Sequence, residues 1–97
     1  MLKESLNRIL KSEKFRKLLK IYKVKRIALF GSYAHGKARR NSDIDFLVEF
    51  DKRVDLLDQI GLKQDLGDLF KKEVDVVTPR ALNQHIRQKI LNEAVYL

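Results

Sequence analysis

The chain has no cysteine and no apolar run that approaches the length of a membrane span. Without cysteine, disulfides and thiolate–metal sites are excluded. Without about 20 consecutive apolar residues, a bilayer-spanning helix is excluded. Residues 1–5 lack the apolar core of a signal peptide, and no repeat or low-complexity tract is present. These absences predict a cytoplasmic protein that has no membrane partner.

A length of 97 residues predicts a single domain, residues 1–97, with one modest hydrophobic core. The net charge of +8 is large for this size and favours phosphate-bearing ligands or an acidic partner. Plain solubility would explain the same charge, and the charge alone does not separate the two interpretations.

Hydrophobic periodicity predicts helices that alternate with strands. Before the first strand, apolar residues at helical spacing with a break near Ser12 indicate two short helices or one kinked helix. A helix over residues 55–70 would bury Leu56, Ile60, Leu66, Leu69 and Phe70, and a last helix after Pro79 would bury Leu82, Ile86 and Ile90. Strands are expected at 27–30, 44–50 and 74–77, and a short helix at 33–38. This order predicts an α/β (α+β) fold, a small mixed β-sheet with helices packed on it.

The most informative feature is a Gly31-Ser32 pair after one apolar strand and an Asp43-Ile44-Asp45 triplet at the start of the next. Side chains alternate along a strand, so Asp43 and Asp45 share a face and repel each other unless a cation lies between them. Carboxylate oxygens favour Mg²⁺ or Mn²⁺. Gly31 lets the backbone approach a ligand closely, and Ser32 can donate to a phosphate and cap a following helix. Phosphate beside metal is the arrangement that nucleotidyl transfer needs.

The sequence Gly-Ser-Tyr-Ala-His-Gly at 31–36, followed by Asn-Ser-Asp-Ile-Asp-Phe-Leu-Val at 41–48, resembles the minimal nucleotidyltransferases. These are the smallest members of the DNA polymerase β-like superfamily. The family pattern also has a third acidic residue on a later strand, which would be Asp75. This chain departs from the pattern at His35, where the family usually has Arg. The resemblance covers roughly residue 23 to the end.

The resemblance implies a mechanism and a partner. Asp43, Asp45 and Asp75 would be catalytic and would bind metal, with two Mg²⁺ ions expected, and Gly31 and Ser32 would bind the nucleotide. Such proteins are commonly antitoxins that transfer AMP from ATP to a tyrosine of a HEPN-type RNase toxin. Two alternatives stay open: an antitoxin that neutralises its partner by binding alone, and a nucleic-acid-binding module, which no aromatic–basic stripe supports.

Other polar residues have more ordinary interpretations. Glu49 shares the strand face of Asp45 but is expected to meet solvent at the far end. His35 is expected at the surface or near phosphate, and His85 on a solvated helix face. Arg39 and Arg40 fit either a solvated loop or a phosphate or partner contact.

Overall fold

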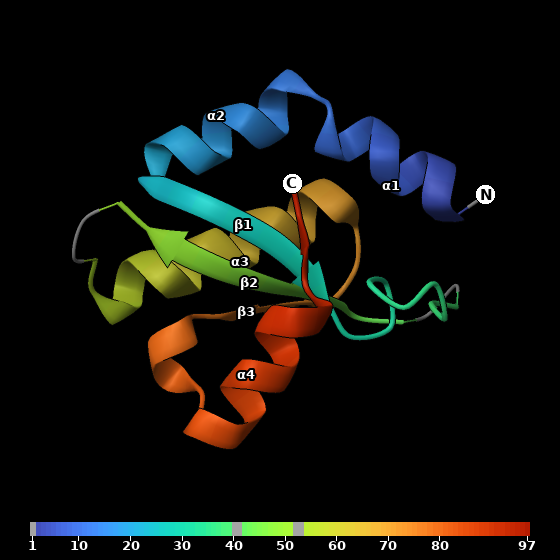
Figure 1. Ribbon diagram of the computed structural model, residues 1–97. Coiled ribbons are helices and arrows are strands. Elements are labelled where there is room, and N and C mark those ends of the chain that lie inside the picture. The colour runs from blue at the N-terminus through green and yellow to red at the C-terminus, as the bar shows by residue number, and fades with distance from the viewer. Residues whose placement is uncertain (1, 40–41, 52–53) are drawn as a thin grey trace.

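The computed structural model describes residues 2–39, 42–51 and 54–97, which form helices on a four-stranded sheet (Figure 1). Arg40 therefore lies outside the described residues. The elements in chain order are α1 (Leu2–Leu10), α2 (Glu13–Ile21), β1 (Val24–Phe30), β2 (Ile44–Phe50), α3 (Leu56–Phe70), β3 (Val74–Val77), the 3-10 helix η1 (Pro79–Ala81), α4 (Gln84–Glu93) and β4 (Val95–Tyr96). None of the helices in this part of the chain has the length and hydropathy to cross a membrane.

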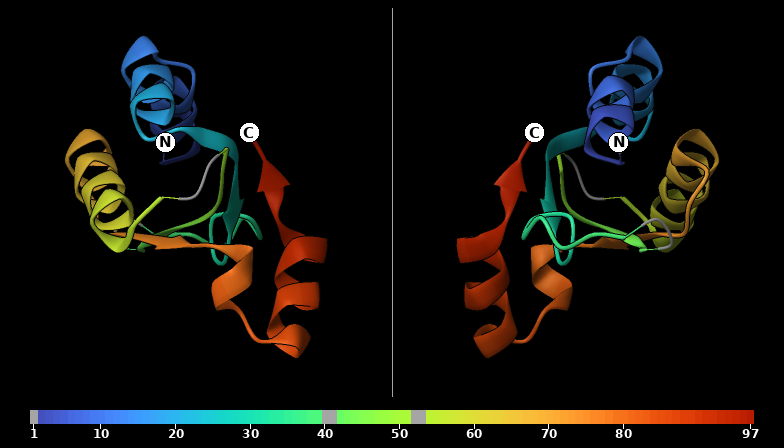
Figure 2. Two further views of the ribbon diagram at one scale, coloured as in Figure 1. Left: turned by 90° about the vertical axis from the view of Figure 1, so that its left-hand side faces the viewer. Right: turned by 90° about the vertical axis from the view of Figure 1, so that its right-hand side faces the viewer.

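The sheet is mixed and has the strand order β3-β2-β1-β4. β1 pairs antiparallel with β2 and with β4, whereas β2 and β3 run parallel. The end-on views show α1, α2 and α3 on one side of the sheet and α4 on the other (Figure 2). The predicted fold class, a small mixed sheet with helices packed on it, is confirmed.

The core lies between the sheet and the three helices on its first side. Its centre is a cluster of aromatic rings, in which Phe15 of α2 lies 6.3 Å from Phe46 of β2 and 5.9 Å from Phe70 of α3. Ile44, Phe46 and Val48 are fully buried on this face of β2, as the alternation predicts. The opposite face of β2 therefore carries Asp45.

The break near Ser12 gives two separate helices. The Ser12 hydroxyl donates to the carbonyl of Ile9 and accepts from the amide of Phe15, so one side chain ends α1 and caps α2. At the start of α3, Asp55 and Asp58 form a reciprocal capping box. Both helix starts therefore follow from local side-chain chemistry.

Two of the predicted helical core faces are partly wrong. Leu56 and Ile60 are exposed on α3, where the core position is taken by Leu62, and Ile86 is half-exposed on α4. Leu56 and Leu57 in the first turn of α3 are both exposed, and α4 buries no residue at all among those described. Periodicity marks an apolar stripe, but it does not say whether another element covers that stripe.

Two boundaries differ from the expectation as well. β1 begins at Val24 rather than at residue 27, because its first residues pair with the end of β2 although their side chains are exposed or half-buried. β4 was not predicted, since a two-residue strand at an edge is too short to show alternation.

Candidate active site

The turn after β1 approaches Asp45 very closely. Gly31 has a φ of +72°, and a β-carbon built on it would overlap Oδ2 of Asp45. The preceding residue, Phe30, lies opposite Asp45 in the antiparallel ladder of β1 and β2. Position 31 therefore requires glycine for two reasons, its backbone conformation and the absence of a side chain.

The segment after Gly31 is a series of turns, so the predicted helix at 33–38 is wrong. The amides of Ala34 and His35 donate to the carbonyl of Gly31, and the amide of Lys37 donates to the carbonyl of Ser32. Gly36 then adopts a φ of +68°, which ends helical geometry after a single turn. Ser32 accordingly caps no helix, and the phosphate interaction expected of a helix N-terminus is not available here.

The three predicted acids come from two adjacent strands. Asp45 of β2 and Asp75 of β3 are direct neighbours in the parallel register, and Asp43 immediately precedes β2. Asp43 and Asp75 are exposed, whereas Asp45 is partly buried. The sheet thus brings together acids that are 30 residues apart in the sequence.

Burial raises the pKa of Asp45 above its ordinary value, and the nearby charges of Asp75 and Asp43 raise it further. The site therefore has an excess of negative charge. In the described part of the chain, no three His, Cys, Asp or Glu side chains are already grouped as a metal-binding set. Asp75 instead directs Oδ1 toward Nζ of Lys63, at 3.7 Å.

Lys63 is a neighbour of the site that the sequence did not reveal. It lies on α3 and reaches Asp75 on the edge strand β3. A lysine in the middle of an amphipathic helix gives no sign of this role. Only the packing of α3 against β3 places it there.

His35 also has an unpredicted partner. Its Nε2 lies 3.1 Å from Oε2 of Glu93, so the turn at 31–36 is tied to the end of α4. His85 is exposed on α4, and Arg39 is also exposed, with its amide donating to the hydroxyl of Ser42. Glu49 forms an ion pair with Arg26 at 3.2 Å, which agrees with its expected place outside the acidic cluster.

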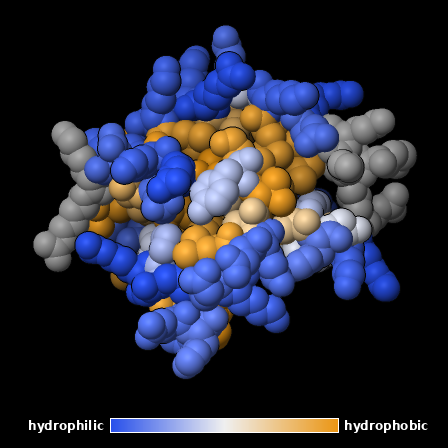
Figure 3. Space-filling view, in the orientation of Figure 1, coloured by the Kyte–Doolittle hydropathy of each residue, from blue (hydrophilic) through white to orange (hydrophobic). Residues whose placement is uncertain are grey.

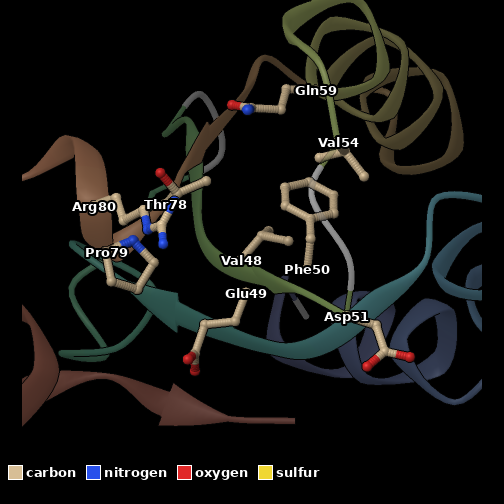
Figure 4. A pocket seen from close by; sticks show the side chains of 9 residues that line it. All are labelled: Val48, Glu49, Phe50, Asp51, Val54, Gln59, Thr78, Pro79 and Arg80. Atoms are coloured by element: carbon tan, nitrogen blue, oxygen red, sulfur yellow. The ribbon is translucent and has the colours of Figure 1, made fainter.

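A cavity of about 560 Å³ lies at the other end of β2 (Figure 4). Phe50 and Val54 form one wall, and Thr78, Pro79 and Arg80 form another. None of the five predicted site residues lines it. The acids and the glycine turn therefore form a separate, open site at the opposite end of the strand.

Comparison with known proteins identifies this arrangement. The Nucleotidyltransferase domain family matches residues 11–97. The chain belongs to this family. The predicted resemblance to nucleotidyltransferases is thereby confirmed.

Individual relatives are similar along most of their length. The protein adenylyltransferase MntA of Thermococcus cleftensis is 36% identical over 94 residues, which cover 97% of this chain and 94% of that protein. A toxin–antitoxin structure with AMP-PNP has a TM-score of 0.74 and 32% identity, over 90% of this chain and 72% of that one. A structure of a tri-AMPylated Shewanella oneidensis HEPN toxin in complex with MNT antitoxin has a TM-score of 0.66 and 26% identity, over 99% and 71%.

Proposed function

We propose that this nucleotidyltransferase is an antitoxin that transfers AMP from ATP to a tyrosine of a HEPN-type toxin, with the help of divalent metal. The observation that carries the proposal is the contact of Gly31 with Asp45, which itself lies beside Asp75 in the sheet. A turn that can approach a phosphate and a pair of acids that can bind metal therefore meet at one point. The adenylyltransferase relative and the AMPylated toxin complex support the choice of AMP and of the partner.

The triphosphate would lie along the turn. Gly31 has no side chain to cover its backbone, and the Ser32 hydroxyl makes no hydrogen bond to another described residue, so it can donate to a phosphate oxygen. The tyrosine oxygen then forms a bond to the α-phosphorus while the bond between that phosphorus and the bridging oxygen breaks. Pyrophosphate leaves with the bond's electrons, and the tyrosine proton passes to a nearby base or to water. Holding both reactants in line supplies much of the rate.

The donor set fits a hard divalent cation. Asp43, Asp45 and Asp75 offer only oxygen ligands, and the raised pKa of Asp45 reflects a crowding of negative charge that a cation would relieve. These three residues would hold two Mg²⁺ ions, or Mn²⁺ in their place. Bound metal would neutralise the phosphate charge and favour the deprotonated acceptor hydroxyl. Asp75 would have to leave Lys63 for this role.

A second function is neutralisation of the toxin by binding alone. Incubating the chain with ATP labelled at the α-phosphate, Mg²⁺ and the HEPN-type protein separates the two. Label on a tyrosine of the toxin, lost in Asp43→Asn and kept in Glu49→Gln, supports transfer. Glu49 is a suitable control because it is a carboxylate on the same face of β2 but pairs with Arg26. A stable complex without label, in the presence of metal, would refute catalysis and leave binding alone.

A further inference from the structure

The excess of positive over negative charge in this protein lies in its first quarter. Residues 1–26 contain ten Lys or Arg and only two Glu, whereas residues 27–97 contain eleven basic and eleven acidic residues. The whole net charge of +8 therefore belongs to α1, α2 and the start of β1. A charge needed only for solubility has no reason to be collected on one layer of the fold.

Eight cations of this layer form no ion pair with another described residue. Every Lys and Arg side chain that the structure describes in residues 1–26 is exposed. Arg26 pairs with Glu49, and the others have no carboxylate of a described residue within 4.0 Å. These eight are Arg8, Lys11, Lys14, Arg16, Lys17, Lys20, Lys23 and Lys25. Such a surface repels itself and attracts an acidic one over a distance of about a Debye length. We refer to it as the cationic face.

An apolar edge adjoins the cationic face. Val95, Tyr96 and Leu97 follow α4 along the outer side of β1, and each is 46–49% exposed. The two surfaces are in contact, because the guanidinium of Arg26 lies 5.8 Å from the centre of the Tyr96 ring and the amide of Leu97 donates to the carbonyl of Ile27. The space-filling view shows hydrophobic side chains across the middle of this side of the molecule, with hydrophilic side chains above and below (Figure 3).

We propose that the edge formed by 95–97 and the cationic face together are the docking surface for an acidic surface of the toxin whose tyrosine is modified. This inference rests on the proposed function and names the surface through which the acceptor binds. An apolar centre beside a charged rim is the usual composition of a protein interface. An edge strand also has unpaired backbone groups that a partner strand can bind.

Other occupants fit less well. A second copy of this chain would bring its own cationic face against this one, and like charges oppose such an approach. RNA would match the charge, but the centre offers the aliphatic Val95 and Leu97, and the one aromatic ring there, Tyr96, already has Arg26 over it. Single-stranded nucleic acid binds best where aromatic rings are free for stacking.

The test is a binding measurement without ATP, made in the Asp43→Asn background so that transfer plays no part. The affinity for the HEPN-type toxin is compared between two double variants, Lys14→Glu/Lys17→Glu on the cationic face and Val95→Ser/Leu97→Ser on the edge. Each has a matched control elsewhere on the surface. Lys71→Glu/Lys89→Glu makes the same change of net charge, and Leu56→Ser/Leu57→Ser removes two apolar side chains that are 69% and 76% exposed on α3.

We expect each surface variant to bind at least about tenfold more weakly, and each control to stay within about twofold. The charge variant should also lose most of the salt dependence that the parent shows. Melting temperatures of all four proteins identify any variant that fails to fold, and single substitutions at Lys14 and Leu97 then replace it.

Several results would overturn the docking surface. The surface variants could bind the toxin with the parental affinity, the controls could weaken binding equally, or the toxin could fail to bind at all. Self-association that Leu97→Ser abolishes would instead identify a second copy as the occupant, and RNA binding that depends on Lys14 and Lys17 would identify RNA. The proposed function is tested separately. Parental transfer with unaffected binding in the surface variants removes the surface and keeps the function, whereas surface-dependent binding without any transfer removes the function and keeps the surface.

Discussion

Gly31 is packed so tightly against Asp45 that a β-carbon on the glycine would overlap a carboxylate oxygen of the aspartate. The two residues are 14 positions apart in the sequence, yet they meet because β1 and β2 form a hairpin-like antiparallel pair in which Phe30 lies opposite Asp45. The turn at Gly31 and the carboxylate of Asp45 are therefore in direct contact, and we expect a change on either side to move the other.

The first prediction concerns this contact. Gly31→Val should weaken ATP binding and transfer strongly, because the new side chain displaces Asp45 in addition to straining a backbone that has positive φ. Ser32→Ala should weaken ATP binding less, since it removes only one phosphate hydrogen bond, whose loss costs about 1 to 3 kcal/mol. Calorimetric titration with ATP measures both effects.

Gly36→Val is the matched control. Gly36 also has a positive φ, +68°, but nothing lies within 4 Å of the position of its β-carbon. The Gly36→Val variant should therefore have a melting temperature lowered by backbone strain, as Gly31→Val should, but it should keep most of its affinity for ATP. Equal losses of affinity at positions 31 and 36 would mean that backbone strain, and not the contact with Asp45, controls nucleotide binding.

The second prediction uses the ionisation of Asp45. Its pKa in the folded state is raised above the ordinary 3.8, so the folded protein holds this proton more tightly than the unfolded chain does. The protonated Asp45 side chain therefore contributes to the free energy of unfolding at low pH, and this contribution is lost as the pH rises through the raised pKa. Without metal, Asp45→Asn should raise the melting temperature at pH 7 and have no such effect near pH 3.

The same substitution should abolish transfer. We expect at least a 100-fold lower rate with Mg²⁺ for Asp45→Asn and for Asp43→Asn, by an order-of-magnitude estimate from the loss of charge stabilisation at a metal site. Melting curves in a chelator and single-turnover rates in Mg²⁺ give both quantities from one preparation. A variant that transfers AMP at the parental rate would remove its aspartate from the site.

Much of this site could be predicted from local sequence. The pairs Gly31-Ser32 and Asp43-Asp45 stand at the boundaries of apolar runs, where strands end and begin, and β2 and β3 were predicted with the bounds that the structure shows. Ser12 and Asp55 cap helices through side chains only three residues from their partners. Short-range chemistry of this kind is visible in a single sequence.

What could not be predicted depends on contacts between distant elements. Lys63 reaches Asp75 only because α3 packs on β3, and Glu93 reaches His35 only because α4 ends near the turn. The exposure of Leu56 depends on which turns of α3 another element covers. The fit of Gly61 within α3 has the same cause, since a β-carbon there would lie 3.0 Å from the hydroxyl of Tyr22 at the end of α2.

The third prediction concerns Asp75 and Lys63. If Asp75 supports the chemical step, Asp75→Asn should lower the transfer rate steeply and leave ATP binding nearly intact. The free energy of unfolding should change by less than about 1 kcal/mol, because the Lys63 pair is long and more than half of the Asp75 side chain is exposed. Rate and melting temperature are measured on the same protein.

Lys63→Met separates this role from a structural one. It breaks the ion pair but keeps the carboxylate, so transfer should persist if Asp75 acts as a ligand. If Asp75 matters only as the partner of Lys63, both substitutions should lower the melting temperature alike and leave the rate per folded molecule unchanged. That result would remove Asp75 from the site.

The last prediction compares two tyrosine hydroxyls, one with a hydrogen-bond partner and one without a partner among the described residues. The hydroxyl of Tyr22 donates to Oδ2 of Asp65 at 2.5 Å and so joins the end of α2 to the middle of α3, and this bond raises the pKa of Tyr22. The hydroxyl of Tyr33 is buried in the turn and has no hydrogen-bond partner among the described residues. Tyr22→Phe should lower the free energy of unfolding by about 1 to 2 kcal/mol, as for a hydrogen bond to a charged acceptor.

Tyr33→Phe should be neutral or stabilising, because it removes a buried polar group that gains nothing from burial. Urea unfolding of both variants at pH 7 measures the two changes on one scale. A large loss of stability in Tyr33→Phe would show that the Tyr33 hydroxyl has a hydrogen-bond partner that stabilises the turn containing Gly31.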